Sequence, residues 1–166
     1  MSSTSLADAI RSAFADNTYR GDDHITVFDP GGRKYDETFQ LLRGCDWREM
    51  PIAQFFQGDT PIPDLAPEAF HYYMPALLLA SINDDFDLNS DLAFSLGFFL
   101  SPQAARQTEG EFPYDQVEAY NRRLSLFTET QREVIARVLL ELKSRGWIDE
   151  TCAQAAMEAV RRGRFE

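Results

Sequence analysis

The chain has little cysteine, little histidine and little positive charge, and each scarcity excludes a class of protein. Its two cysteines, Cys45 and Cys152, form no disulfide framework, which favours a reducing compartment, and we expect the protein in the cytoplasm. With only His24 and His71 and no Cys-x-x-Cys or His-Glu-x-x-His motif, the sequence gives no support for a zinc site. Sixteen Lys and Arg against 27 Asp and Glu give a net charge of −11, which opposes binding to nucleic acid and to anionic membranes.

Long hydrophobic runs and catalytic motifs are also missing. The longest apolar stretches, residues 74–80 and 92–100, fall short of the roughly 18 residues of a membrane-spanning helix, and the first residues lack the pattern of a secretory signal. A Gly-x-Ser-x-Gly motif, a P-loop and a dinucleotide-binding glycine motif are absent as well. We therefore expect no membrane association, no catalytic residue, no metal and no cofactor, and we predict that the protein is not an enzyme.

The chain does contain enough apolar material for a core of its own. It has 166 residues, 44% of them hydrophobic, with 13 phenylalanines. Apolar residues recur mainly at helical spacing, so we predict a mainly α fold, a compact single-domain bundle of about six to eight helices over residues 1–166. The run from His24 to Asp29, followed by Pro-Gly-Gly, predicts one short extended or hairpin segment near residues 24–35.

Two of the predicted helices have clear signals. Residues 129–145 contain one apolar stripe, and Thr128 and Gln131 form a capping-box pattern at their start. Residues 67–82 begin with a proline, which suits a first helical turn, and we expect them to form the central core helix. Pro75 inside this helix removes a backbone hydrogen bond, so we expect a kink near His71. Further helices are predicted near residues 6–14, 35–42, 51–56, 91–100 (deeply buried), 102 onwards and 152–160.

Negative charge is concentrated in the middle of the chain. Residues 49–105 contain no Lys or Arg and eight Asp and Glu, so this base-free window has a charge of −8. Residues 1–48 contain six bases and eight acids, and residues 106–166 contain ten bases and eleven acids, which leaves −2 and −1 for the flanks. Two explanations stay open: a solvated acidic face, or a surface that attracts a cationic partner.

Four aspartates lie close together at residues 84–91, and two more precede the central helix. Oxygen side chains at alternate positions resemble the start of a calcium loop, but the glycine at the sixth position and the closing glutamate are missing. Carboxylates that favour the N-terminus of the next helix explain the spacing better than a metal site does. The predicted partner-binding acids are Asp84, Asp85, Asp87 and Asp91, with Asp59 and Asp64 as a secondary patch.

One further cluster combines titratable and aromatic groups. His71, Tyr72 and Tyr73 lie at the predicted kink, where an interrupted hydrogen-bond ladder can expose backbone carbonyls and open a ligand pocket. A polar cluster that satisfies a bent core helix explains the same residues and is the preferred interpretation. The pocket at His71, Tyr72 and Tyr73 stays as the alternative.

The segment Phe70-His-Tyr-Tyr-Met-Pro-Ala-Leu-Leu-Leu-Ala resembles the Phe-x-Tyr-Tyr-x-Pro-Ala-x-Leu-x-Ala hallmark of a small bacterial helical domain family of unknown function. Gly44-Cys-Asp-Trp47 and the stretch from Leu124 to Gln131 resemble other parts of the family's pattern, in the same order. The resemblance covers roughly residues 37–143. It implies a helical domain and transfers no catalytic residue.

The base-free window, the missing catalytic motifs and the small size favour a binding role. We expect an intracellular protein-binding protein, of the immunity or antitoxin type, that neutralises a basic bacterial toxin or effector by covering it with an acidic surface. Its partner would be a basic protein encoded nearby, and the sequence leaves the oligomeric state open. Two alternatives belong to other classes: a divalent-metal-dependent enzyme that uses the acids of residues 84–91, and an acidic nucleic-acid mimic.

Overall fold

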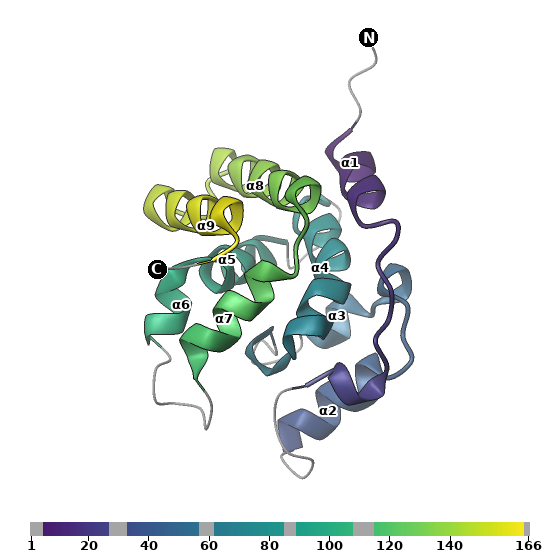
Figure 1. Ribbon diagram of the computed structural model, residues 1–166. Coiled ribbons are helices and arrows are strands. Elements are labelled where there is room, and N and C mark those ends of the chain that lie inside the picture. The colour runs from purple at the N-terminus through teal and green to yellow at the C-terminus, as the bar shows by residue number, and fades with distance from the viewer. Residues whose placement is uncertain (1–4, 27–32, 57–61, 85–88, 108–114, 165–166) are drawn as a thin grey trace.

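The structure, a computed structural model, describes residues 5–26, 33–56, 62–84, 89–107 and 115–164. Within these residues the chain forms nine α-helices and three short 3₁₀ helices, so the prediction of a mainly α fold is confirmed (Figure 1). The α-helices are α1 (Leu6–Ala13), α2 (Arg33–Leu42), α3 (Ile52–Phe55), α4 (Pro67–Ser81), α5 (Asn89–Leu100), α6 (Pro102–Gln107), α7 (Gln116–Ser125), α8 (Glu129–Ser144) and α9 (Glu150–Arg162). The 3₁₀ helices are η1 (Asp22–His24), η2 (Trp47–Glu49) and η3 (Ile62–Asp64).

The central helix is α4, as its composition predicts. It contacts α1, α3, α5, α7 and α8. Because neighbours cover it on several sides, its apolar residues, among them Phe70, Tyr73 and Leu77, need no single stripe. One hydrophobic cluster, to which each of the described α-helices contributes, surrounds it.

A side chain from outside α4 compensates for the proline in its middle. Pro75 has no N–H, so the carbonyl of His71, four residues earlier, loses its helical partner. Asn17, in the segment after α1, donates a hydrogen bond from Nδ2 to this carbonyl at 3.1 Å. The helix extends from Pro67 to Ser81 with Pro75 inside it, and a residue 54 positions away provides the donor that the His71 carbonyl lacks within the helix.

The helices α8 and α9 lie side by side (Figure 1). The predicted capping box is present at the start of α8: Thr128 Oγ1 accepts from the Gln131 N–H, and Gln131 Oε1 accepts from the Thr128 N–H. Beyond its end, Gly146 adopts a positive φ of 74°, a conformation that glycine tolerates best.

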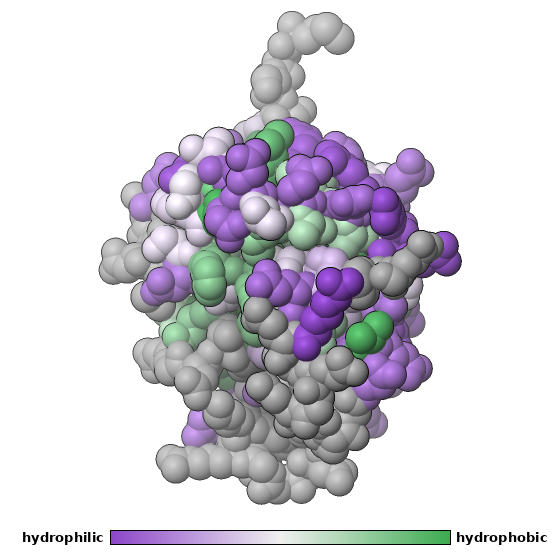
Figure 2. Space-filling view, turned by 90° about the vertical axis from the view of Figure 1, so that its left-hand side faces the viewer, coloured by the Kyte–Doolittle hydropathy of each residue, from purple (hydrophilic) through white to green (hydrophobic). Residues whose placement is uncertain are grey.

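On the side of the molecule where α9 lies, hydrophilic side chains cover the upper part and apolar side chains gather in the middle (Figure 2).

The segment predicted near residues 24–35 as extended or as a hairpin pairs with a distant part of the chain, whereas a hairpin would pair with the residues directly after its turn. Helix α2 occupies the end of this range, and residues 27–32 lie outside the described residues. Thr26 forms an isolated antiparallel bridge with Leu65, in the segment before α4. Ile25 and Leu65 are both buried in the core, and this shared burial brings the two segments together.

Helix α7 contains a buried arginine. Arg123 is 6% exposed, and its Nη2 atom donates hydrogen bonds to the carbonyls of Pro63 and Leu65 at 2.9 and 2.8 Å. Its guanidinium carbon lies 5.2 Å from the centre of the Phe70 ring. The side chain therefore joins α7 both to α4 and to the segment that leads into α4.

Gly97 marks the point at which α5 approaches the connection between α8 and α9. A Cβ atom at this position would lie 2.8 Å from Cγ2 of Ile148. We expect Gly97→Ala to lower the free energy of unfolding by about 1–2 kcal/mol, although alanine is favoured over glycine in a helix interior by roughly 0.5–1 kcal/mol. The reason is that the buried Ile148 side chain has to move. Urea denaturation measures the change, with Ser95→Ala on the same helix as the control; equal stability of the two variants would contradict the prediction.

Candidate functional site

Asp84 and Asp91 lie at the two ends of the densest acidic stretch, and both are exposed. Asp84 follows α4, and its side chain is 81% exposed although it accepts a hydrogen bond from Arg145 Nη1 at 2.6 Å. Asp91 lies in the first turn of α5. Asp85 and Asp87 lie outside the described residues. Acids are therefore accessible at both ends of the predicted patch. The charge of one of them, Asp84, is partly compensated by Arg145 from the flanking sequence.

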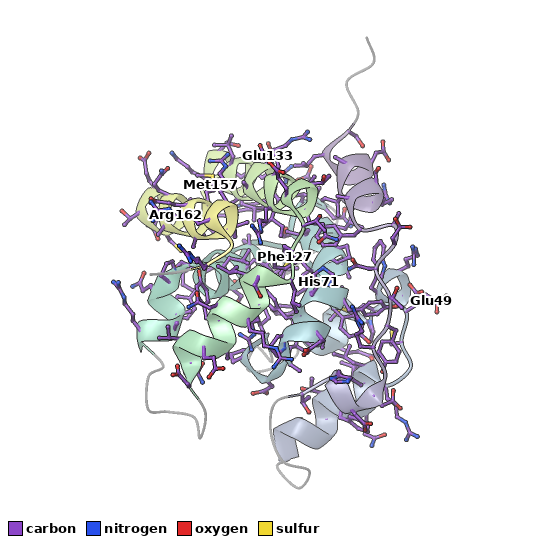
Figure 3. The ribbon with its side chains drawn as sticks, in the orientation of Figure 1. Glu49, His71, Phe127, Glu133, Met157 and Arg162 are labelled. Carbon is purple, nitrogen blue, oxygen red and sulfur yellow. The ribbon has the colours of Figure 1, made fainter. Side chains whose placement is uncertain are left out.

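Of the two aspartates predicted to form a secondary acidic patch, Asp64 does not lie at the surface. Asp64 is buried, with 8% of its surface exposed, because it lies in η3 directly before the central helix. With so little of its surface exposed, Asp64 is not placed to contact a partner, contrary to the prediction. Asp59 lies outside the described residues. Of the other acids in the base-free window, Glu68 pairs with Arg122, and Glu49 on η2 is exposed (Figure 3).

An exposed aromatic side chain lies beside Asp91 on α5. We expected this helix to be deeply buried, but Phe94 is 61% exposed and Phe98 is partly exposed. Residues three, four and seven positions apart share one side of a helix, so Asp91, Phe94 and Phe98 form one outward surface, which we name the α5 face. The α5 face therefore combines a carboxylate, a largely exposed aromatic ring and a partly exposed one.

A polar network joins α1, α4 and α8 at His71. Gln131 Nε2 donates to the carbonyl of Ala13 and to Oδ1 of Asn17, both at 3.2 Å. Gln131 Oε1 faces the Thr128 N–H and Nε2 of His71, both at 3.0 Å. Because backbone groups on two sides fix the orientation of the Gln131 amide, Nε2 of His71 is the donor in this contact. In the neutral imidazole the other ring nitrogen, Nδ1, is then an acceptor.

The His71 ring lies among aromatic side chains. Its centre is 5.2 Å from that of Phe127, in the α7–α8 connection, and 6.3 Å from that of Phe14. Figure 3 labels His71 and Phe127 close to each other. This burial lowers the pKa of His71 below its ordinary value of 6.5. The hydrogen bond to Gln131 acts in the opposite direction, and the positive charge of Arg20 adds to the lowering.

The lowered pKa of His71 predicts a pH dependence of stability. A folded-state pKa below the unfolded value means that, below pH 6.5, the unfolded chain binds more protons than the folded chain does. We therefore expect the free energy of unfolding to fall as the pH drops through 6.5 towards the folded-state pKa of His71. Urea denaturation across this range measures the loss. His71→Asn should flatten the profile there and His24→Asn should not; a profile that His71→Asn leaves unchanged would contradict the assignment.

His71 also lines a pocket of about 320 Å³, between the segment after α1, the start of α4 and the α7–α8 connection. We name this space the histidine pocket, because both histidines of the chain line it. Its lining residues are Thr18, Arg20, His24, Glu68, His71 and Leu126.

Tyr72 and Tyr73 do not line the histidine pocket. Tyr73 is fully buried, and its hydroxyl donates to the carbonyls of Leu42 and Cys45 at 2.8 and 3.0 Å. Tyr72 is buried against Tyr19, with 5.4 Å between ring centres. Burial raises the pKa of both Tyr72 and Tyr73. Of the three residues predicted to form a pocket, His71 lines the histidine pocket, and the two tyrosines pack in the core.

A larger hollow of about 480 Å³ lies between α1, η2 and α4. Its wall is largely apolar, and its two arginines, Arg11 and Arg48, already pair with Asp8 and Asp46. Arg20 in the histidine pocket, by contrast, makes no ion pair with any residue that the structure describes. The histidine pocket is therefore the better equipped of the two for a polar ligand.

The described ranges of the chain show neither a metal cluster nor a membrane-spanning helix. In those ranges, no three His, Cys, Asp or Glu side chains are grouped closely enough to hold a metal ion. Because Asp85 and Asp87 lie outside them, a metal site at residues 84–91 is not tested. No helix in the same ranges has both the length and the apolar character for a bilayer crossing.

Comparison with known proteins gives one family. No curated protein and no solved structure matches the chain. The model of a family of unknown function, DUF6714, matches residues 2–162. The match extends well beyond the segment of residues 37–143 in which the sequence resembles a helical family of unknown function. The chain therefore belongs to the DUF6714 family of unknown function.

Proposed function

We propose that the protein binds a basic protein partner through the α5 face, with Asp84 as a further exposed acid, as an immunity or antitoxin-like protein that covers a basic toxin or effector. The exposed Phe94 beside Asp91 is the observation that supports this most, because the other large apolar residues of α5 are buried or only partly exposed. The net charge of −11, most of it in the base-free window, supports a cationic partner.

The two kinds of side chain on the α5 face have different tasks in such a complex. A buried aromatic anchor supplies much of the binding energy at a protein interface. Carboxylates at its rim accelerate association and select a partner of opposite charge. Asp84 keeps most of its side chain accessible despite its contact with Arg145, so it can also attract a cationic partner.

The nucleic-acid mimic has less support from the same acids. A mimic needs carboxylates at regular spacing along an exposed surface. In the described part of the base-free window, Asp64 is buried and Glu68 pairs with Arg122, which leaves Glu49, Asp84 and Asp91 as the exposed acids.

The test is co-purification of the full chain with proteins encoded next to its gene, at low and high salt. We expect a complex with a basic protein that weakens as salt rises, because salt screens charge attraction. Phe94→Ala should weaken this complex about tenfold or more. Leu140→Ala on α8, which truncates the other large exposed apolar residue of the described chain, is the matched control and should have no effect. A complex whose affinity changes neither with salt nor on Phe94→Ala would contradict the proposal.

A further inference from the structure

The histidine pocket gathers positive charge on an acidic protein. Arg20 is exposed and makes no ion pair within the described chain. Glu68, the acid in the lining, is compensated by its ion pair with Arg122. Burial alone would raise the pKa of Glu68, but hydrogen bonds from its own N–H and from Arg122, with the nearby charges, lower it. Glu68 therefore stays ionised and paired, and Arg20 leaves the pocket with a net positive charge.

His71 adds a directional acceptor to this charge. Its Nε2 atom is occupied by Gln131, and Nδ1 has no hydrogen-bond partner among the described residues. The network around Gln131 holds the ring in place before any ligand arrives, which reduces the entropy that binding would cost. A neutral imidazole held in this way accepts a hydrogen bond from a hydroxyl group at Nδ1.

The size of the pocket limits what it can take. Its volume of about 320 Å³ lies at the lower end of the range of small-molecule sites. A peptide helix or a nucleic-acid strand is too large for it. Three separate segments of the chain contribute the lining residues, so the pocket is built by the fold itself.

From this combination of charge, acceptor and size, we propose that the histidine pocket binds a small hydroxylated anion. Arg20 pairs with the phosphate or carboxylate of the ligand, His71 accepts a hydrogen bond from its hydroxyl group at Nδ1, and His24 lines the same space. This site involves no residue of the α5 face and does not depend on the proposed protein partner.

The two histidines provide the measurement. Because the chain has only His24 and His71, the imidazole signals in an NMR spectrum of the full protein report directly on the pocket. The titrants are inorganic phosphate, glycerol phosphate and glycerate, at neutral pH and constant ionic strength. We expect saturable shifts of both imidazoles, with glycerol phosphate binding more tightly than inorganic phosphate because its hydroxyl reaches His71. Comparison of glycerol phosphate with glycerate tells which anion the pocket prefers.

Substitutions of two exposed arginines test the anion contact. Arg20→Gln should weaken the binding of glycerol phosphate about tenfold or more, because a charge-assisted hydrogen bond is lost. Arg11→Gln on α1 removes the same charge outside the pocket and should leave the affinity unchanged. Shifts that do not saturate with any of the three titrants, or saturable binding that Arg20→Gln leaves intact, would overturn the proposal. Phe94→Ala should not alter the titration, so failure of the partner proposal stays distinguishable from failure of this one.

Discussion

Gln131→Ala should lower the free energy of unfolding by about 3–4 kcal/mol, because four partners lose their hydrogen bonds at once. Gln131 is 5% exposed, so water does not replace these bonds readily. The Ala13 carbonyl, the Asn17 amide, the His71 ring and the Thr128 N–H each depend on it. Urea denaturation followed by circular dichroism measures the loss.

Two further variants separate the polar network from simple loss of volume. Thr130→Ala changes an exposed residue in the same helical turn and should alter stability by no more than about 0.5 kcal/mol. Gln131→Glu keeps the size of the side chain but places a carboxylate oxygen against the Ala13 carbonyl and Asn17 Oδ1, so we expect a loss at least as large as that of Gln131→Ala. If Gln131→Ala is as stable as Thr130→Ala, the network does not hold α1, α4 and α8 together.

Arg123→Ala should lower the free energy of unfolding by about 3 kcal/mol, since two backbone carbonyls near the core lose their donor and the Phe70 ring loses its cation. The neighbouring Arg122 is the matched control. Its ion pair with Glu68 is at the surface, with 61% of the Arg122 side chain exposed. Surface pairs contribute only about 0–1 kcal/mol, so Arg122→Ala should have a small effect. Similar losses in the two alanine variants, measured by urea denaturation, would contradict the structural role of Arg123.

This buried arginine also explains why α7 is not evident from the sequence. Its apolar positions are Val117, Tyr120 and Leu124, and the polar residues around them do not complete a broad stripe. Arg123 takes a buried position that a hydrophobic pattern assigns to an apolar residue. In α8, by contrast, the capping box and the stripe are both local, and the sequence predicts that helix almost to the residue.

Burial of individual acids is equally hard to obtain from charge patterning. Asp64 and Asp84 look alike in the sequence, as acids of one base-free window, yet Asp64 is buried and Asp84 is largely exposed. The difference arises because the segment before α4 pairs with Thr26 and receives Arg123, and both contacts come from distant parts of the chain.

Of the residues that line the histidine pocket, the sequence predicts only His71 as a pocket residue. His71 draws attention because Pro75 lies four positions later in an apolar helix. Arg20 and His24 belong to a segment with no motif, and only the tertiary fold brings them to α4. A lone arginine near a lone histidine in the sequence would have been the available signal, and it is too common to be specific.

The hydrogen bond from Asn17 to the His71 carbonyl has a consequence for folding during synthesis. When the ribosome has finished α4, the His71 carbonyl can already meet Asn17, but the amide that holds both Asn17 and the His71 ring has not yet been made. Gln131 is synthesised only with α8, after α5, α6 and α7. The network is therefore complete only once α8 has been made, which favours folding of α1, α4 and α8 in one concerted step over their sequential assembly.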